Sequence, residues 1–262
     1  MGGFSFASVI LSYFLIAGGT FATTLIAARL GINNEYLGYL IMAVGAFVGG
    51  FFAARASHGS TIIEPALGAI VMVASLVGLG LAVSSSETRS LMLLPSTMKG
   101  LGLTAAASAG GGIAGAFVSE KMLGRSATSS APWIVYASIA GFGAAVIGTI
   151  FGGVLGKGEP GPLYGVIAIC CLLAGIASGA SARSRPLLAT LFGGAIGVGA
   201  FFYLAIMIFA AIFTRGEMGG AAGVPSEVYI GIAVVAVGAG IVTMLGALIG
   251  WVVVGQKSAG AA

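Results

Sequence analysis

The residues best suited to chemistry in this chain of 262 residues lie together in one short stretch, ARASHGSTIIEPALG at 54–68. The stretch holds Arg55, His58 and Glu64, and His58 is the single histidine of the sequence. In a chain with only 7% charged residues, this is the densest cluster of polar side chains. We therefore take Arg55, His58 and Glu64 as the candidate functional polar cluster, suited to a gate or coupling site, or to a contact with another subunit or a lipid headgroup.

The same charges also fit a purely structural interpretation. Thr61-x-x-Glu64 matches a capping box, in which Thr61 is the N-cap of a helix and Glu64, three residues later, accepts a hydrogen bond from the backbone N–H of Thr61. A helix that starts with Pro65 at its first position is the alternative. Both place Glu64 in the first turn, where a negative charge complements the helix dipole, as Arg55 does at the end of the preceding helix.

The composition shows what kind of element must position this cluster. The chain is 58% hydrophobic and 7% charged, with a mean hydropathy of +1.12, whereas a soluble domain is about a quarter charged. Most of the surface must therefore face lipid. A helix needs about 20 apolar residues to cross the hydrocarbon. Eight such runs occur, at 6–29, 36–55, 63–83, 100–119, 132–155, 163–182, 187–213 and 228–252. The predicted fold is an all-α, polytopic transmembrane bundle of about eight spans.

The distribution of Lys and Arg predicts how the bundle is oriented. Eight spans place both termini on one side, together with six of the eleven Lys and Arg residues, against five on the other side. The positive-inside rule then predicts cytoplasmic termini in the plasma (inner) membrane. The first apolar run has no basic segment before it and is longer than the apolar region of a secretory signal. We expect it to be retained as a span.

The chain also resembles a duplication. IAGGTFATTLIAARLG (16–31) resembles IAGFGAAVIGTIFGGVLG (139–156), and ARASHGSTIIEPALG resembles ASARSRPLLATLFGG (180–194), which keeps an Arg and a Pro but neither His nor Glu. These matches predict one membrane domain made of two tandem four-helix repeats, 1–126 and 131–262. Four spans return the chain to its starting side, so the two repeats would share one orientation.

Glycine, with 46 residues, often recurs at four-residue spacing within the predicted spans. Apolar surface does not drive helices together in lipid, but small residues on one face let two backbones approach closely. Most of these faces should pack within the chain, and one could be left for another subunit. The candidate helix-packing positions are Gly45, Gly49, Gly111, Gly115, Gly148, Gly152, Gly156, Gly175, Gly179, Gly193, Gly197, Gly246 and Gly250.

Several function classes are disfavoured by what the sequence lacks. It has no Asp, no H-E-x-x-H, no P-loop motif and no basic run interleaved with aromatics. The adjacent Cys170 and Cys171 have no neighbouring His or carboxylate and are read as small apolar residues. We therefore predict no catalytic, cofactor-binding or metal-binding residues, and neither a nucleotide nor a nucleic acid as partner.

Two hypotheses of function follow from these observations. The first is a non-enzymatic structural or accessory protein that packs through glycine-rich helix faces against itself or other membrane subunits. The second is a channel or facilitator for a small neutral solute, running between the two repeats. No charged residue lies near the centre of a predicted span. Because charge within the membrane usually marks a transport pathway, this pattern favours the first hypothesis.

Overall fold

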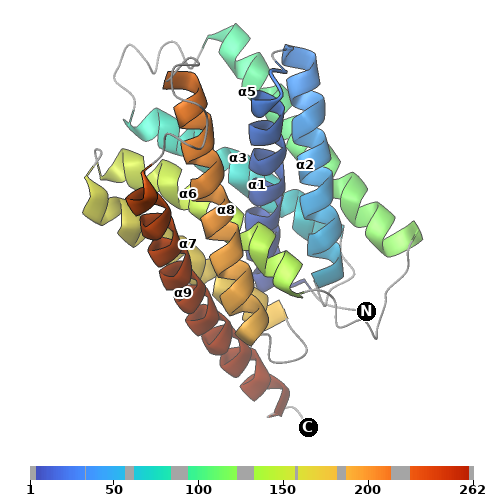
Figure 1. The fold of residues 1–262 in the computed structure, drawn as a ribbon. Helices are drawn as coiled ribbons and strands as arrows, with labels where there is room; N and C mark the ends of the chain where they lie inside the picture. The colour runs from blue at the N-terminus through green and yellow to red at the C-terminus, as the bar shows by residue number, and fades with distance from the viewer. Residues whose placement is uncertain are drawn as a thin grey trace.

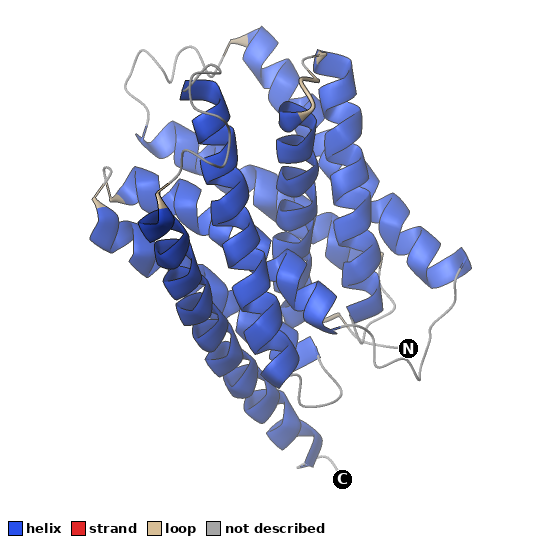
Figure 2. Cartoon of the chain, in the orientation of Figure 1, coloured by secondary structure: helices blue, strands red, loops and turns tan. Residues whose placement is uncertain are grey.

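The computed structural model describes residues 4–32, 34–56, 62–83, 94–122, 133–156, 159–181, 187–213 and 225–259. These parts of the chain form helices joined to short turns, and no strand occurs among them (Figure 2). Eight helices in the described residues are long and apolar enough to cross a membrane. The prediction of an all-α transmembrane bundle with eight spans is therefore confirmed.

The helices agree with the predicted spans more closely at some ends than at others. Their bounds are α1 Phe6–Arg29, α2 Glu35–Ala56, α3 Ile63–Val83, α5 Pro95–Phe117, η1 Val118–Met122, α6 Trp133–Leu155, α7 Pro160–Ser181, α8 Leu187–Phe213 and α9 Ser226–Ala259. The element η1 is a single π-helical turn that continues α5.

Proline explains why two helices begin earlier than predicted. α5 and α7 start at Pro95 and Pro160, several residues before the predicted positions. The first helical residue needs no hydrogen bond from its N–H, so proline is well suited to that position. α3 starts at Ile63, and Pro65 is then its third residue, still within the turn whose N–H groups have no partner inside the helix. The predicted start of this span at residue 63 is therefore confirmed, and the alternative start at Pro65 is wrong. The N-cap predicted at Thr61 lies outside the residues that the structure describes.

Helices α1 and α6 form the centre of the bundle. In its most apolar 18-residue window, α6 is 61% buried and α1 is 50% buried, whereas α3, α8 and α9 are each 22% buried. α1 packs against α2, α3 and α6, and α6 packs against α7 and α8 (Figure 1). The two most buried helices are thus the first of each predicted repeat, and they meet each other.

The seam between α1 and α6 is a direct backbone contact. A Cβ atom at Gly18 would overlap the carbonyl oxygen of Ile139, and one at Gly143 would overlap that of Phe14. The two contacts are reciprocal, because Gly143 and Ile139 each follow their counterparts Gly18 and Phe14 by 125 residues. Reciprocity of this kind is what a twofold relation between the two halves produces.

Other contacts between helices recur in the second half, 125 positions later in the sequence. Gly68 of α3 meets Ser12 and Tyr13 of α1, and Gly193 of α8 meets Ala137 and Ser138 of α6.

The fourth helix of each half follows a slightly longer shift. Gly115 of α5 contacts the Phe47 carbonyl of α2, and Gly246 of α9 contacts the Leu172 carbonyl of α7. The two carbonyls are 125 positions apart in the sequence, whereas the two glycines of the fourth helices are 131 positions apart. The neighbour order is also shared, since the fourth helix packs on the second and third in both halves. Two tandem repeats predict this pattern, and duplication of the chain stays a prediction, as do the boundaries 1–126 and 131–262.

Exchanging glycine for alanine on α6 tests the backbone contact at the seam. In Gly143→Ala the new methyl group meets the Phe14 carbonyl, and we expect a loss of about 1–3 kcal/mol from overpacking. In Gly153→Ala, on the same helix, the methyl group enters open space, and alanine should add about 0.5–1 kcal/mol of helix stability. Thermal unfolding of both variants in one detergent measures the difference. A Gly143→Ala protein as stable as the parent would contradict the described seam.

Candidate functional site

Glu64 is completely buried, with 0% of its surface exposed, in the first turn of α3. One of its carboxylate oxygens, Oε1, accepts a hydrogen bond of 2.9 Å from the backbone N–H of Ser5. Ser5 is the N-cap of α1, and its own side chain accepts from the N–H of Ser8 at 3.4 Å. In a capping box the carboxylate three residues into a helix accepts the N–H of the N-cap. Here Glu64 supplies that carboxylate from a different helix.

The position of Glu64 explains why a carboxylate can be buried at this point. The side chain lies at the start of α1 and also within the first turn of α3. The first turn of a helix carries a partial positive charge, and a negative side chain there is stabilised. Two helix starts therefore act on one carboxylate. The prediction that Glu64 complements the dipole of its own helix is extended to a second helix, 59 positions away in the sequence.

Arg55 makes its contacts with a different part of the molecule. Its guanidinium lies 5.6 Å from the centre of the Phe51 ring, one turn earlier on α2. The Arg55 side chain also lies near Tyr136 of α6, a residue that is 1% exposed. Tyr136 packs with Phe52 of α2 and Trp133 of α6, each at a ring-centre distance of 5.4 Å. Arg55 thus belongs to an aromatic contact between the two halves.

The candidate cluster therefore divides into two structural contacts. Glu64 joins α3 to the start of α1, and Arg55 joins the end of α2 to α6. His58 lies outside the residues that the structure describes. Among the described residues, no group of three or more His, Cys, Asp or Glu side chains could hold a metal ion. Cys170 and Cys171 are free and buried.

Most intramembrane hydroxyl groups bond to their own helix. The side chains of Ser12, Ser178 and Thr243 donate to the carbonyl oxygen four residues earlier, at 2.6–2.8 Å. Such a bond satisfies the hydroxyl without a ligand or neighbouring helix. One hydroxyl pair joins two helices instead, Tyr13 of α1 and Ser75 of α3, at 3.1 Å.

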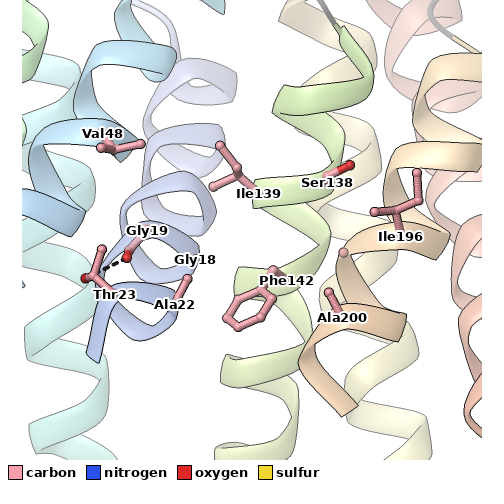
Figure 3. Close-up of a pocket in the computed structure, with 11 residues that line it drawn as sticks. Gly18, Gly19, Ala22, Thr23, Val48, Ser138, Ile139, Phe142, Ile196 and Ala200 are labelled. Atoms are coloured by element: carbon pink, nitrogen blue, oxygen red, sulfur yellow. Dashed lines mark hydrogen bonds between the residues drawn. The ribbon is translucent and has the colours of Figure 1, made fainter. Parts of the chain in front are cut away.

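A groove of about 270 Å³ lies between α1 and α2 on one side and α6 and α8 on the other (Figure 3). Its lining is Gly, Ala, Val, Ile and Phe apart from Thr23 and Ser138. Both hydroxyls donate to backbone carbonyls, Thr23 to Gly19 at 3.0 Å and Ser138 to Ile134 at 2.6 Å. Ile196, which also lines the groove, is 54% exposed. The groove is therefore apolar, and it opens on the lipid-facing side of the bundle.

The structure places each of the thirteen predicted packing glycines against a neighbouring element. On α2, Gly45 and Gly49 meet α1, and on α5, Gly111 and Gly115 meet α2. The remaining contacts pair α6 with α7, α7 with α9, and α8 with α6. They are made by Gly148, Gly152, Gly156, Gly175, Gly179, Gly193, Gly197, Gly246 and Gly250.

Sequence reasoning did not identify Ser5, Tyr136 or the groove. Ser5 directly precedes the first apolar run, and a serine in that place is a usual N-cap signal. Its pairing with Glu64 has no signal in the sequence, because it depends on how α1 and α3 pack. No family model, curated protein or solved structure matches this chain.

Substitutions of Glu64 test its role as a cap supplied from another helix. Glu64→Ala leaves the half-buried Ser5 N–H without its acceptor, which should destabilise the protein by about 1–3 kcal/mol. Glu64→Gln keeps an oxygen acceptor and should lose less. Glu227→Ala is the control, since Glu227 lies in the first turn of α9 but is exposed. Thermal unfolding and cleavage of the N-terminal segment by protease should rank Glu64→Ala as the weakest variant. Equal stability of Glu64→Ala and Glu227→Ala would contradict the cap.

Proposed function

We propose that this protein is a non-enzymatic structural or accessory subunit of a membrane assembly, which binds a spanning helix of another subunit through the outer face of α5. The observation that carries the proposal is a row of small, exposed residues on that face. Gly102, Ala106, Gly110 and Ala114 follow one another at four-residue spacing, and all four are exposed. A Cβ atom added at Gly102 or Gly110 would meet nothing within 4 Å.

The three consecutive glycines of α5 separate the inner contacts from the outer face. Gly111 lies against the backbone of Ala43 on α2, and Gly112 meets the side chain of Ile16 on α1. A Cβ atom added at Gly110 would meet neither helix. Successive residues are turned about 100° apart on a helix, so packing within the chain explains Gly111 and Gly112 but not Gly110. The glycine at 110 is left for a contact outside the chain.

The second half of the molecule provides an internal comparison for this face. With the shift that relates α5 to α9, the corresponding residues are Ala233, Val237, Ile241 and Leu245, and all four are exposed. Three of them, Val237, Ile241 and Leu245, are bulky side chains that suit a surface in contact with lipid tails. The four corresponding positions of α5 carry only Gly and Ala, the residues that allow close approach of two helix backbones in a membrane, with exposed Leu103, Ile113 and Phe117 elsewhere on the helix. The contrast supports a protein helix as the neighbour of α5.

The seam between the halves supports this proposal over a solute channel in the same place. The α1 and α6 backbones touch at Gly18 and Gly143 with no room for even a methyl group. The hydroxyls of Ser12, Ser178 and Thr243 are bound to their own helices, and those of Thr20, Ser108, Thr149 and Ser181 are buried without a hydrogen-bond partner. A pathway for a neutral solute needs continuous space along its length, and the backbone contact at the seam leaves none there. Liposomes containing the protein should therefore swell in glycerol no faster than empty liposomes.

Replacing the small residues of α5 by leucine tests the binding face. Gly110→Leu should remove whatever protein co-purifies in mild detergent, or should shift a self-associated form to the monomer, since leucine holds two backbones apart. Gly238→Leu is the matched control, because Gly238 is also exposed in open space, but on α9. Size-exclusion chromatography with light scattering and identification of bound proteins give the readout. A parent protein that is monomeric and free of partners, or a Gly110→Leu variant with its assembly intact, would contradict the proposal.

We also propose that both termini lie in the cytoplasm, with the protein in the plasma (inner) membrane. The start of α1 and the end of α9 lie at the same end of the bundle, as an even number of spans requires (Figure 1). The excess of Lys and Arg on that side is six to five, which supports the cytoplasmic assignment. A reporter that works only in the cytoplasm should be active when it is fused after Lys257. Activity of a reporter that works only outside the cytoplasm would reverse the orientation.

A further inference from the structure

The groove between α1, α2, α6 and α8 lies where the two halves of the molecule differ. The twofold relation at the seam maps residues of the first three helices of one half onto residues 125 positions away, as Gly18 maps onto Gly143. Ser138 in the groove then corresponds to Tyr13, and Ala22 corresponds to Ile147. In both pairs the groove has the smaller residue.

Two further pairs come from α8 and α3. Gly197 in the groove corresponds to Met72, and Ala200 corresponds to Ser75. The groove thus has a related place on the opposite side of the α1–α6 seam. That place has the larger side chain opposite Ser138, Ala22 and Gly197, whereas the groove has the larger one at Thr23, Phe142 and Ile196, whose counterparts are Gly148, Ala17 and Val71.

The related place is filled by the protein itself. Met72 is 2% exposed, Ile147 is 3% exposed, and both belong to the buried core. Tyr13 packs against that core, and its hydroxyl bonds to Ser75 at 3.1 Å. On the groove side, no side chain of comparable size stands at these positions. Because protein interiors are close-packed, an open space opposite a filled one indicates that something outside the chain fills it.

The surroundings of the groove define the chemistry of its occupant. Its lining residues lie near the middle of four spanning helices, such as Gly18 in α1 and Val48 in α2, at the depth of the lipid tails. Its two hydroxyls, Thr23 and Ser138, already donate to backbone carbonyls. Exposed Ile196 borders the groove towards the lipid. A polar solute would find no free hydrogen-bond donor among these side chains, whereas an apolar chain needs none.

We propose that the groove binds one acyl chain of a bilayer lipid, which takes the place that Tyr13, Met72 and Ile147 occupy on the opposite side. The lipid chain enters from the membrane beside Ile196 and lies against the α1–α6 seam. It completes the packing of the second half as those three side chains complete the packing of the first. The site would be a structural lipid site, and it does not depend on the proposed subunit contact of α5.

A variant that transfers the filling side chains tests the lipid site. Ser138→Tyr with Ala200→Ser reproduces the Tyr13–Ser75 pair within the groove. The protein is placed in liposomes containing a phosphatidylcholine with a diazirine at the middle of one acyl chain, and is illuminated. Labelled segments are identified by mass spectrometry. In the parent, the groove segments of α1 and α8 should be labelled, as should the outer face of α9 at Val234, which is 67% exposed. In the variant, labelling of the groove segment of α1 should be lost, whereas labelling of exposed Ile196 on α8 and of α9 should be unchanged.

Each other outcome overturns the proposal. Labelling of the groove segment of α1 that persists in the double variant shows that no lipid chain occupies the place of Tyr13, and a parent with an unlabelled groove shows the same. If the double variant fails to fold, Ala22→Ile, which copies Ile147, makes the same test with one added side chain.

A thiol experiment distinguishes lipid from water in the groove. In Ala200→Cys a charged, membrane-impermeant maleimide should not react above the level of the parent, whose Cys170 and Cys171 are buried. Reaction at Cys in this position would show an aqueous groove and replace the lipid site by a solute pathway.

Discussion

Contact between helix backbones at glycine is the interaction on which this structure depends. The solvent for most of the surface is lipid, which is as apolar as the side chains, so burial of apolar surface does not hold the helices together. Close approach of backbones does, and it is possible only where a Cβ atom is missing. The α1–α6 seam at Gly18 and Gly143 is one such contact, and the α2–α5 and α7–α9 pairs are others. Each contact also determines the register of two helices, since a methyl group would meet a carbonyl oxygen.

Polar groups are accommodated by the same backbone. Hydroxyl groups donate to carbonyls one turn earlier, which makes them compatible with hydrocarbon. Glu64 is stabilised by the starts of two helices, and Arg55 lies near the aromatic side chains of Phe51 and Tyr136. Both charged residues lie at helix ends, where the dipoles favour their sign. The densest polar stretch of the sequence therefore joins helices, within the residues that the structure describes.

The two halves share these contacts and differ in what they leave open. Backbone contacts constrain residues that cannot change without moving a helix, so the shared framework consists mainly of glycines. Positions away from these contacts are free to differ. On α5 and α9 the difference lies in one row of exposed positions, which are Gly and Ala on α5 and mainly bulky on α9. Beside the seam it lies in Tyr13 and Ser138, of which one fills space and the other leaves a groove. The proposals for a partner helix and for a lipid chain arise from these two differences.

Composition and spacing alone predicted the fold class and the number of spans. A chain with 7% charged residues cannot present a soluble surface, and the length of each apolar run follows from the thickness of the membrane. Four-residue glycine spacing likewise indicates a face suited to packing, because it follows from helix geometry. The starts predicted for α5 and α7 were wrong, because each helix begins several residues earlier, at a proline that is compatible with its first turn.

Only the tertiary structure decided which residues meet. Ser5 and Glu64 are 59 positions apart, and no local pattern joins them. The glycine spacing did not indicate which neighbour each face would meet, nor that Gly110 would face outward while Gly111 and Gly112 face inward. The groove depends on four helices from both halves. Sequence patterns report the local periodicity of one helix, whereas a site of this kind is produced by the relative positions of several helices.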